Sequence, residues 1–373
     1  MLKIDFRVSV STQTGLVQFT LNRPKSLNAL NMEQVVLMEK QLRSIVDDPK
    51  HPGIVLMGSG DRAFCAGGDV LHIADPELAK TEWNRRWFSH EFMLNYLISQ
   101  YKRPVVSIWR GIVMGGGVGI SIYGSHRIAT DNTLFAMPET TIGFFPDVGS
   151  SYFLSHAIKK DFPGLGLFLG MTGHRLTGAD AFKCGLATHF VPSGQVDELI
   201  SSLNSSSGID KTISRFSATP SAPTSLTPEL LNSISQYFGN SDKQSFREFF
   251  QDLEQGATRG DEFAVSTIKT LRSKCPLTVW VWYESFKRGS GETLEQALAR
   301  EYNMCIQVTE IDPYNFREGV RAQLIEKNRG TPPTYKPQRI EEVTEEMVDE
   351  IVNSKAGGDL LVCIRENRLM YDY

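Results

Sequence analysis

The sequence predicts an α/β fold followed by a mostly helical C-terminal region. In roughly the first 200 residues, short runs of β-branched and apolar residues alternate with segments whose apolar residues recur at helical spacing. After about Glu198 the strand-like runs stop, and the remaining periodicity is helical. We therefore expect an α/β core at residues 1–200 and a mostly helical region at residues 201–373.

Short connections separate the strands and helices expected in the core, as is typical of α/β proteins. Apolar residues at helical spacing predict helices at residues 32–48 and 82–100, and a third helix that ends near Tyr123. Runs rich in valine, isoleucine, leucine and phenylalanine predict strands at residues 16–21, 53–57, 105–109, 126–130 and 133–136.

The second part begins with residues 201–227, which are rich in serine, threonine and proline and poor in charge. We expect this stretch to be a long surface connection. Beyond it, helical periodicity predicts helices at residues 228–238, 245–255, 262–274, 277–288, 294–309, 316–327 and 344–353.

The composition, with 41% hydrophobic and 22% charged residues, is that of an ordinary globular protein. Its net charge of −4 argues against a general attraction to nucleic acid or to an anionic membrane. The sequence begins without an apolar signal core or an Arg/Ser-rich presequence, and its longest uncharged run, residues 111–125, is too short to span a bilayer. The five cysteines form no CxxC pair and the seven histidines have no HExxH spacing, so we expect neither a disulfide framework nor a metal site.

Residues 135–149 are the most informative segment. They place two carboxylates, Glu139 and Asp147, eight residues apart in an apolar loop with two prolines. Charged groups in such a setting are costly unless they are paired, protonated or used in chemistry. The pair therefore predicts an acid or base of an active site, although each residue alone is also typical of a helix turn or a cap.

Two glycine clusters, Gly67-Gly68 and Gly115–Gly117, each come shortly after a predicted strand. Glycine suits tight turns and close helix packing, which is the simpler interpretation. The functional interpretation is that both clusters direct backbone N–H groups at one point, as in an oxyanion hole. The spacing alone favours neither.

Three weaker signals have ordinary alternatives. Residues 58–63 match GxGxxA after a strand, but no helix-like segment follows, which argues against a dinucleotide site. Lys25 is suited to a phosphate contact or to a solvated turn. Glu91 lies on an aromatic-rich helix, where a carboxylate is usually an ordinary polar position.

Four motifs together resemble the crotonase superfamily of enoyl-CoA hydratases and isomerases. They lie in residues 22–30, 63–69, 115–119 and 137–139, in the order that the superfamily has them. The resemblance implies a spiral of ββα units that form two roughly perpendicular sheets. It also implies an acyl-CoA ligand whose thioester carbonyl lies between the N–H groups of Gly68 and Gly116.

The same resemblance implies the position of coenzyme A. Its backbone contacts are expected at Ala63, Ala66, Gly67 and Gly68, with Lys25 near the phosphates. Coenzyme A is the leaving group of such a reaction, so we expect no cofactor, and no nucleic acid or membrane partner. Crotonases often form trimers or hexamers, which makes a homo-oligomer an option, although the longer C-terminal region departs from the common pattern.

Within the superfamily, residues 114–119, 135–140, 145–149, 273–277 and 318–322 resemble a branch of thioester hydrolases. This implies cleavage of 3-hydroxyisobutyryl-CoA in valine breakdown, or of 3-hydroxypropionyl-CoA, and substrate contacts at the positions of Glu91, Gly116, Glu139 and Asp147. The location implied is the mitochondrial matrix for a eukaryotic source and the cytoplasm for a bacterial one. Residues 359–373 match no motif of the branch.

One position separates hydrolysis from hydration. Typical hydratases have a second glutamate in the glycine run, where this sequence has Gly119. Adding water across a C=C bond needs two acid/base groups, whereas thioester hydrolysis needs a polarised carbonyl and one carboxylate. The sequence therefore favours a hydrolase in which Glu139 reacts and Asp147 recognises the substrate. The alternatives are an enoyl-CoA hydratase or isomerase, and a non-catalytic relative associated with mitochondrial ribosomes.

Overall fold

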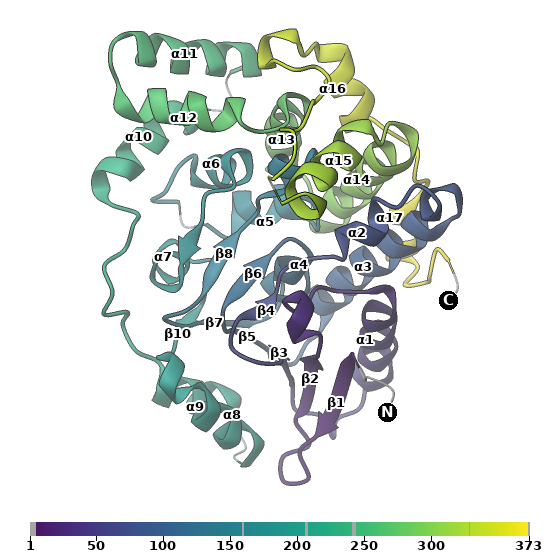
Figure 1. Cartoon of the computed structure of the whole chain (residues 1–373). Coiled ribbons are helices and arrows are strands. Elements are labelled where there is room, and N and C mark those ends of the chain that lie inside the picture. The colour runs from purple at the N-terminus through teal and green to yellow at the C-terminus, as the bar shows by residue number, and fades with distance from the viewer. Residues whose placement is uncertain (1–4, 159, 206–207, 241–243, 328, 372–373) are drawn as a thin grey trace.

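The computed structural model describes residues 5–158, 160–205, 208–240, 244–327 and 329–371. Its strands form two sheets, which lie in the middle of the molecule (Figure 1). The larger sheet has the order β1 (Phe6–Val10), β2 (Val17–Leu21), β3 (Ile54–Gly58), β5 (Val105–Trp109), β7 (His126–Ala129) and β10 (His189–Phe190). The smaller sheet has the order β4 (Ala63–Cys65), β6 (Ile112–Met114), β8 (Leu134–Ala136) and β9 (Leu176–Thr177).

From β3 to β8, successive strands alternate between the two sheets. β3, β5 and β7 lie side by side in the larger sheet, and β4, β6 and β8, which follow them, lie side by side in the smaller one. All these neighbours are parallel; only the β1–β2 and β8–β9 pairs are antiparallel. Helix α3 (Trp83–Gln100) comes after strands β3 and β4 in the chain, and helix α4 (Gly116–Ile122) comes after strands β5 and β6. This repeated strand–strand–helix order confirms the spiral of ββα units.

One face of the larger sheet packs into the main hydrophobic core. Phe19 and Leu56 of the sheet belong to the same buried cluster as Val35 and Met38 of α1 (Met32–Ile45). Asn31 caps the start of helix α1. Its side-chain oxygen accepts a hydrogen bond from the backbone N–H of Gln34, and the side-chain oxygen of Gln34 accepts one from the backbone N–H of Asn31. Helices α1 and α3 pack against each other and cover this face.

Two helices cover the opposite face of the larger sheet, where the sequence predicted a long surface connection. Residues 201–227 do not form one long connection, because α8 (Val196–Ser205) and α9 (Ile209–Phe216) occupy its first half. Their buried apolar side chains pack against Val55 and Val106 of the sheet in a second hydrophobic cluster. Only residues 217–227 run as an extended connection, which links α9 to α10 in Figure 1.

The remaining helices fold back over the α/β core and occupy the upper part of the molecule in the view of Figure 1. They are α10 (Pro228–Phe238), α11 (Phe246–Thr258), α12 (Glu262–Arg272), α13 (Pro276–Gly289), α14 (Leu294–Ile306), α15 (Tyr314–Val320), α16 (Glu345–Val352) and α17 (Leu360–Arg365). Between the sheets and this group lie α2 (Val70–Ile73), α5 (Ser150–His156), α6 (Leu165–Thr172) and α7 (Gly178–Cys184). Shorter helical turns are Pro24–Ser26, Leu78–Lys80, Glu139–Ile142, Ser193–Gln195, Gln307–Ile311, Arg321–Ile325 and Ile340–Glu342. Helix α14 contacts α3, α5 and α16.

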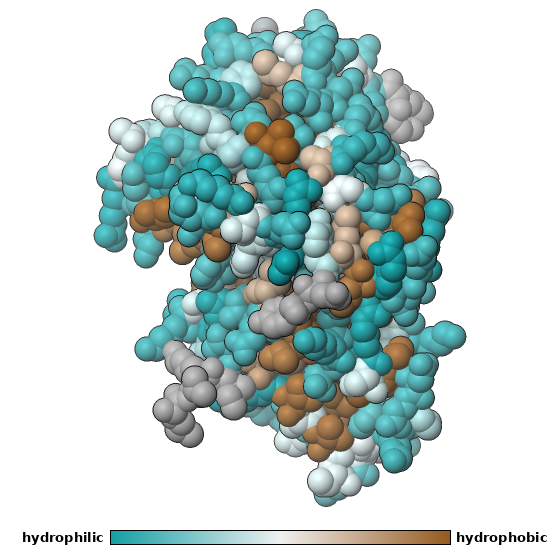
Figure 2. Space-filling view, turned by 90° about the vertical axis from the view of Figure 1, so that its right-hand side faces the viewer, coloured by the Kyte–Doolittle hydropathy of each residue, from teal (hydrophilic) through white to brown (hydrophobic). Residues whose placement is uncertain are grey.

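The surface is mainly hydrophilic on the face shown in Figure 2. Hydrophobic side chains appear there as several separate patches between polar ones. Among the described residues, no helix combines the length and the apolar character needed to cross a bilayer.

Candidate active site

A cavity of about 940 Å³ brings the sequence motifs together. Its wall is built from the loop after β4, the start of α4, the turn after β8, and parts of α3 and α15. A volume of this size accommodates a large organic ligand. The sequence-predicted residues in its wall are Ala66, Gly67, Gly68, Glu91, Gly116, Glu139 and Asp147.

The two backbone donors lie close together. Gly68 pairs with Leu30 in an isolated parallel bridge, and Gly116 is the first residue of α4. A Cβ atom added to Gly116 would lie 3.3 Å from the backbone N of Gly68. Within the described ranges, no hydrogen bond uses either N–H as its donor. Two free N–H groups at the wall of one cavity are suited to a single oxyanion.

A side chain at position 116 would displace the carboxylate of Glu91. The added Cβ atom would lie only 2.3 Å from Oε1 of Glu91. The preceding residue, Gly115, has φ +49°, a backbone conformation that L side chains rarely adopt. These constraints fix where the N–H of Gly116 can lie.

Glu139 begins a helical turn directly after Pro138, and its side chain is almost completely buried. Its Oε2 atom has no hydrogen-bond partner in the described part of the chain. Burial and the charge of Asp147 raise the pKa of Glu139 well above its usual value. An unpaired buried carboxylate oxygen is costly, so its presence at a cavity indicates that a ligand or water supplies the partner.

Two further carboxylates share the cavity wall. Burial, then the charge of Glu301, raise the pKa of Asp147 to about 8. Burial, then the charge of Asp147, raise the pKa of Glu91 on α3 well above its usual value. Because like charges in a buried cluster oppose one another's ionisation, this group does not ionise completely at neutral pH, so that one member can be a carboxylate while another keeps its proton. It can therefore both donate and accept a proton.

Position 119 has no room for a side chain. A Cβ atom added to Gly119 would lie 2.7 Å from Cβ of Val148 and 2.9 Å from the side-chain amide of Asn95. Val148 directly follows Asp147, so the loop with the second carboxylate fills the space beside Gly119. Glu139 is accordingly the single carboxylate of the hydratase-type pair.

Comparisons with known proteins show the family of this chain. The sequence model described as Enoyl-CoA hydratase/isomerase matches residues 16–352. The chain belongs to this family, the crotonases. The mitochondrial 3-hydroxyisobutyryl-CoA hydrolase of Xenopus tropicalis is 38% identical, over 91% of this chain and 87% of the relative. The human protein of the same name is 36% identical, over 93% of this chain and 88% of the relative.

Solved crotonase structures have the same fold over nearly the whole chain. A carnitinyl-CoA dehydratase from Mycobacterium thermoresistibile superposes with a TM-score of 0.81 at 33% identity, covering 94% of this chain and 96% of that structure. An enoyl-CoA hydratase from Rhodobacter sphaeroides gives 0.79 at 29% identity, covering 94% and 98%. The C-terminal helices are therefore part of a fold that other crotonases share.

Two residues assigned to coenzyme A from the crotonase motifs lie outside the cavity wall. Lys25 is exposed on the turn Pro24–Ser26, although its neighbour Ser26 is at the wall. Ala63 is buried in β4, and its carbonyl accepts from Nδ2 of Asn28 at 2.7 Å. The structure brings the other predicted residues together but not these two, whose contacts with coenzyme A stay a prediction.

Several wall residues of this crotonase site were not singled out from the sequence. Arg23 and Asp69 form an ion pair of 2.9 Å between two of the motifs. Lys274, from the C-terminal region, donates from Nζ to Oγ1 of Thr141 at 2.7 Å, and burial followed by the charge of Arg175 lowers its pKa. Arg23 and Lys274 lie inside motifs that had been quoted, so the signal existed, but the contacts of Arg23 with Asp69 and of Lys274 with Thr141 did not follow from spacing.

Proposed function

We propose that this crotonase is an acyl-CoA thioester hydrolase that cleaves 3-hydroxyisobutyryl-CoA to the free 3-hydroxy acid and coenzyme A. The observation that supports it most is the buried carboxylate of Glu139, whose Oε2 atom has no hydrogen-bond partner in the described part of the chain. The same cavity has Gly68 and Gly116 in its wall, and there is no space for a second glutamate at Gly119. Relatives named for this activity, 36–38% identical over about nine-tenths of the chain, point to the same reaction.

In this proposal the thioester oxygen lies between the N–H groups of Gly68 and Gly116. When the carbonyl carbon becomes tetrahedral, the oxygen gains negative charge, which both N–H groups stabilise. The loss of one such donor typically costs about 3–4 kcal/mol of transition-state stabilisation. The rigid glycine backbone described above keeps these donors in place without reorganisation.

Two routes lead from Glu139 to the products. In the first, its carboxylate attacks the carbonyl carbon, the C–S bond breaks, and water then hydrolyses the enzyme-bound anhydride. In the second, Glu139 takes a proton from a water that attacks the carbonyl directly. Single turnover in heavy-oxygen water separates them, because only the first route puts the label into Glu139.

Asp147 has two tasks in the proposed mechanism. It hydrogen-bonds the 3-hydroxyl of the acyl group, and its protonated form gives a proton to the departing coenzyme A thiolate. A pKa of about 8 keeps much of Asp147 protonated at neutral pH, which is what a donor to the thiolate requires. An acyl group without the hydroxyl leaves this buried carboxyl unpaired, and the site should discriminate against it.

Coenzyme A is proposed to lie against the backbone of residues 66–68, with Lys25 and Lys274 near its phosphates. It is part of the substrate, and the proposed steps require no cofactor or metal. For a eukaryotic source we place the reaction in the mitochondrial matrix, as the names of the relatives suggest. A homo-oligomer is part of the same proposal, and analytical ultracentrifugation measures it.

Free-thiol release from a small acyl-CoA panel tests the proposal. We expect 3-hydroxyisobutyryl-CoA to be cleaved with the highest kcat/KM, 3-hydroxypropionyl-CoA to be within roughly 100-fold of it because it lacks one methyl group, and isobutyryl-CoA to be the poorest. Equal cleavage of all three would contradict the role of Asp147. No thiol release from any of them would refute the hydrolase.

A further inference from the structure

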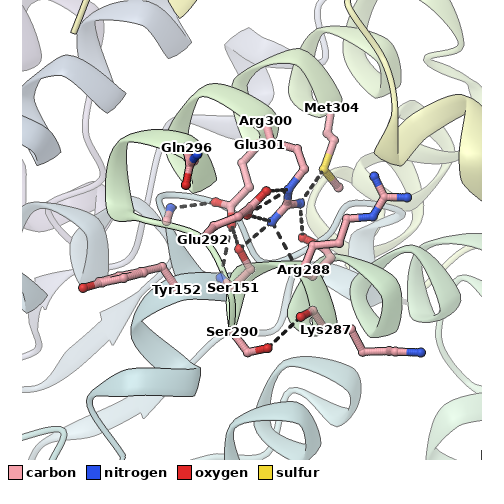
Figure 3. A network of polar contacts seen from close by, with 12 residues as sticks. Ser151, Tyr152, Lys287, Arg288, Ser290, Glu292, Gln296, Arg300, Glu301 and Met304 are labelled. Carbon is pink, nitrogen blue, oxygen red and sulfur yellow. Dashed lines mark hydrogen bonds and ion pairs between the residues drawn. The ribbon is translucent and has the colours of Figure 1, made fainter. Parts of the chain in front are cut away.

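Helix α14, from the C-terminal region, holds the loop that follows Asp147. Glu301 of this helix is fully buried and accepts hydrogen bonds from the backbone N of Gly149 at 2.6 Å and of Ser151 at 3.1 Å. The hydroxyl of Ser151 also donates to Glu301. Figure 3 shows these contacts. One carboxylate thus binds the chain two and four residues after Asp147.

The loop needs such a partner because its backbone is in an unfavourable conformation. Val148 has φ +56° and Gly149 has φ +77°, so two successive residues adopt left-handed values. For a β-branched residue such as Val148, this conformation costs free energy and persists only when neighbours enforce it. The hydroxyl of Tyr123 donates to the carbonyl of Val148 at 2.7 Å, and Glu301 binds the next N–H. Together they fix the direction in which Asp147 leaves the backbone.

A second residue of α14 contacts the Asp147 carboxylate itself. Cys305, one helical turn after Glu301, has its Sγ atom 3.9 Å from Oδ2 of Asp147. The same face of the helix therefore contacts both the backbone of the loop and the side chain of Asp147.

The buried charge of Glu301 is itself stabilised by a polar network (Figure 3). Nη2 of Arg300 donates to Oγ of Ser151 at 3.0 Å and to Oε2 of Glu292 at 2.7 Å. Buried carboxylates are tolerated when hydrogen bonds and a nearby cation compensate for lost water. Glu292 contacts Arg300 but makes no hydrogen bond or ion pair with residues 149–151 within the described chain.

We propose that Glu301 is a positioning residue that orients Asp147, so that the site prefers acyl-CoA substrates with a 3-hydroxyl over those without one. This inference rests on the proposed function, because Asp147 must recognise the hydroxyl. Glu301 does not line the substrate cavity. It acts only through the loop. Isobutyryl-CoA still needs the proton that Asp147 gives to the thiolate but offers no hydroxyl for Asp147 to bind, so it should lose less than the hydroxylated substrate when Glu301 changes.

The test compares 3-hydroxyisobutyryl-CoA with isobutyryl-CoA in Glu301→Gln. A glutamine side chain has one oxygen, and its NH₂ group would face one of the two N–H donors, so the loop loses a contact at unchanged side-chain size. We expect kcat/KM for the hydroxylated substrate to fall at least about tenfold, and that for isobutyryl-CoA to change less than about threefold. An equal fall for both substrates would mean a merely structural role and would overturn the proposal.

Glu292→Gln is the matched control. It removes one carboxylate from the same network without touching the loop, and we expect the preference for the hydroxylated substrate to stay within about twofold of the parent protein. If Glu292→Gln reduces the preference as much as Glu301→Gln does, the effect belongs to the network as a whole, and the assignment to Glu301 is wrong.

Ser151→Ala decides the question if Glu301→Gln does not fold. It removes one donor to Glu301 and leaves both backbone contacts, and we expect the preference to fall about threefold. An unchanged preference would overturn the inference. Wild-type protein that releases no thiol from 3-hydroxyisobutyryl-CoA would refute the proposed function itself. If the Glu301 and Ser151 variants keep the preference of the wild-type protein for 3-hydroxyisobutyryl-CoA over isobutyryl-CoA, only the positioning role of Glu301 is refuted.

Discussion

The α/β core and the C-terminal helices contribute to the site in different ways. The core supplies the groups proposed to meet the reacting carbonyl: the N–H groups of Gly68 and Gly116, and the carboxylate of Glu139. The C-terminal region supplies groups that hold or surround them, such as Glu301 and Lys274. Changes in the core should therefore affect the rate of the chemical step, whereas changes in the C-terminal region should affect selectivity and binding.

The largest effect is expected for Glu139→Gln. The amide can neither attack the carbonyl nor take a proton from water, and general-base or nucleophilic groups typically contribute ~10²–10⁴-fold. We expect kcat for thiol release to fall about 10³-fold with KM changed less than about threefold. A loss below about tenfold, measured by stopped-flow thiol detection, would contradict the assignment of Glu139.

Gly116→Ala should have the next largest effect. Its Cβ atom would lie 2.3 Å from Oε1 of Glu91 and 3.3 Å from the backbone N of Gly68, so we expect Glu91 to be displaced and the methyl group to crowd the two donors. We expect a loss of ~10²-fold in kcat. Gly194→Ala is the control, because a Cβ atom there meets nothing within 4 Å, and its activity should match that of the parent protein.

Asp147→Asn should reduce both rate and selectivity. The amide cannot give a proton to the thiolate, which lowers kcat/KM for both substrates, and it binds the 3-hydroxyl more weakly than the carboxyl group does, so we expect about a tenfold loss with 3-hydroxyisobutyryl-CoA and a smaller loss with isobutyryl-CoA. This variant should lose at least as much preference as Glu301→Gln. A larger effect of Glu301→Gln would mean that α14 acts on more than Asp147.

Lys274→Gln tests the contribution of the C-terminal region to binding. The half-buried ammonium lies at the cavity wall, and we expect its loss to raise KM about three- to tenfold with kcat unchanged, most strongly at low ionic strength. Lys269→Gln, on the exposed surface of α12, is the matched control and should leave KM unchanged. A fall in kcat with constant KM would place Lys274 in the chemical step.

The smallest effect concerns stability and pH. The pKa of Asp147 is about 8 in the folded protein, above its ordinary 3.8, so the folded state binds the proton more tightly than the unfolded state. Its contribution to stability is complete below the ordinary pKa and is lost as the pH rises toward 8. Asp147→Asn does not titrate, so its melting temperature relative to the parent should increase between about pH 5 and pH 8, by ~2 °C or more. A constant difference measured by calorimetry would contradict the raised pKa.

Elements with strong local patterns were predictable from the sequence. The strand at residues 105–109 and the helix at residues 228–238 have the predicted bounds. The first is a short β-branched run, and the second begins at Thr227, which caps it, and Pro228, which suits a first turn. Strands β4 and β6, with three residues each, are too short to show a period, and α8 and α9 were obscured by the serine-rich composition of their segment.

The reacting part of the candidate site was also predictable, because the resemblance to the crotonase motifs implied Gly68, Gly116 and Glu139, and all three lie at the wall of one cavity. The absence of a glutamate at position 119 was visible, but the filling of that space by Val148 was not. Glu301 gave no local signal, since it is separated from Gly149 by about 150 residues and looks like an ordinary polar position of a helix. Long-range contacts of this kind depend on how helices pack, which the periodicity of one helix does not determine.

The preference for hydrolysis over hydration is the central claim, and one paired measurement tests it most directly. The same purified protein is given 3-hydroxyisobutyryl-CoA, with thiol release as the signal, and crotonyl-CoA, with loss of the C=C absorbance as the signal. We predict that kcat/KM for thiol release exceeds that for hydration at least about 100-fold, equivalent to ~2.7 kcal/mol of barrier. Hydration of crotonyl-CoA at a comparable or higher kcat/KM would contradict the assignment of Glu139 as the single reacting carboxylate.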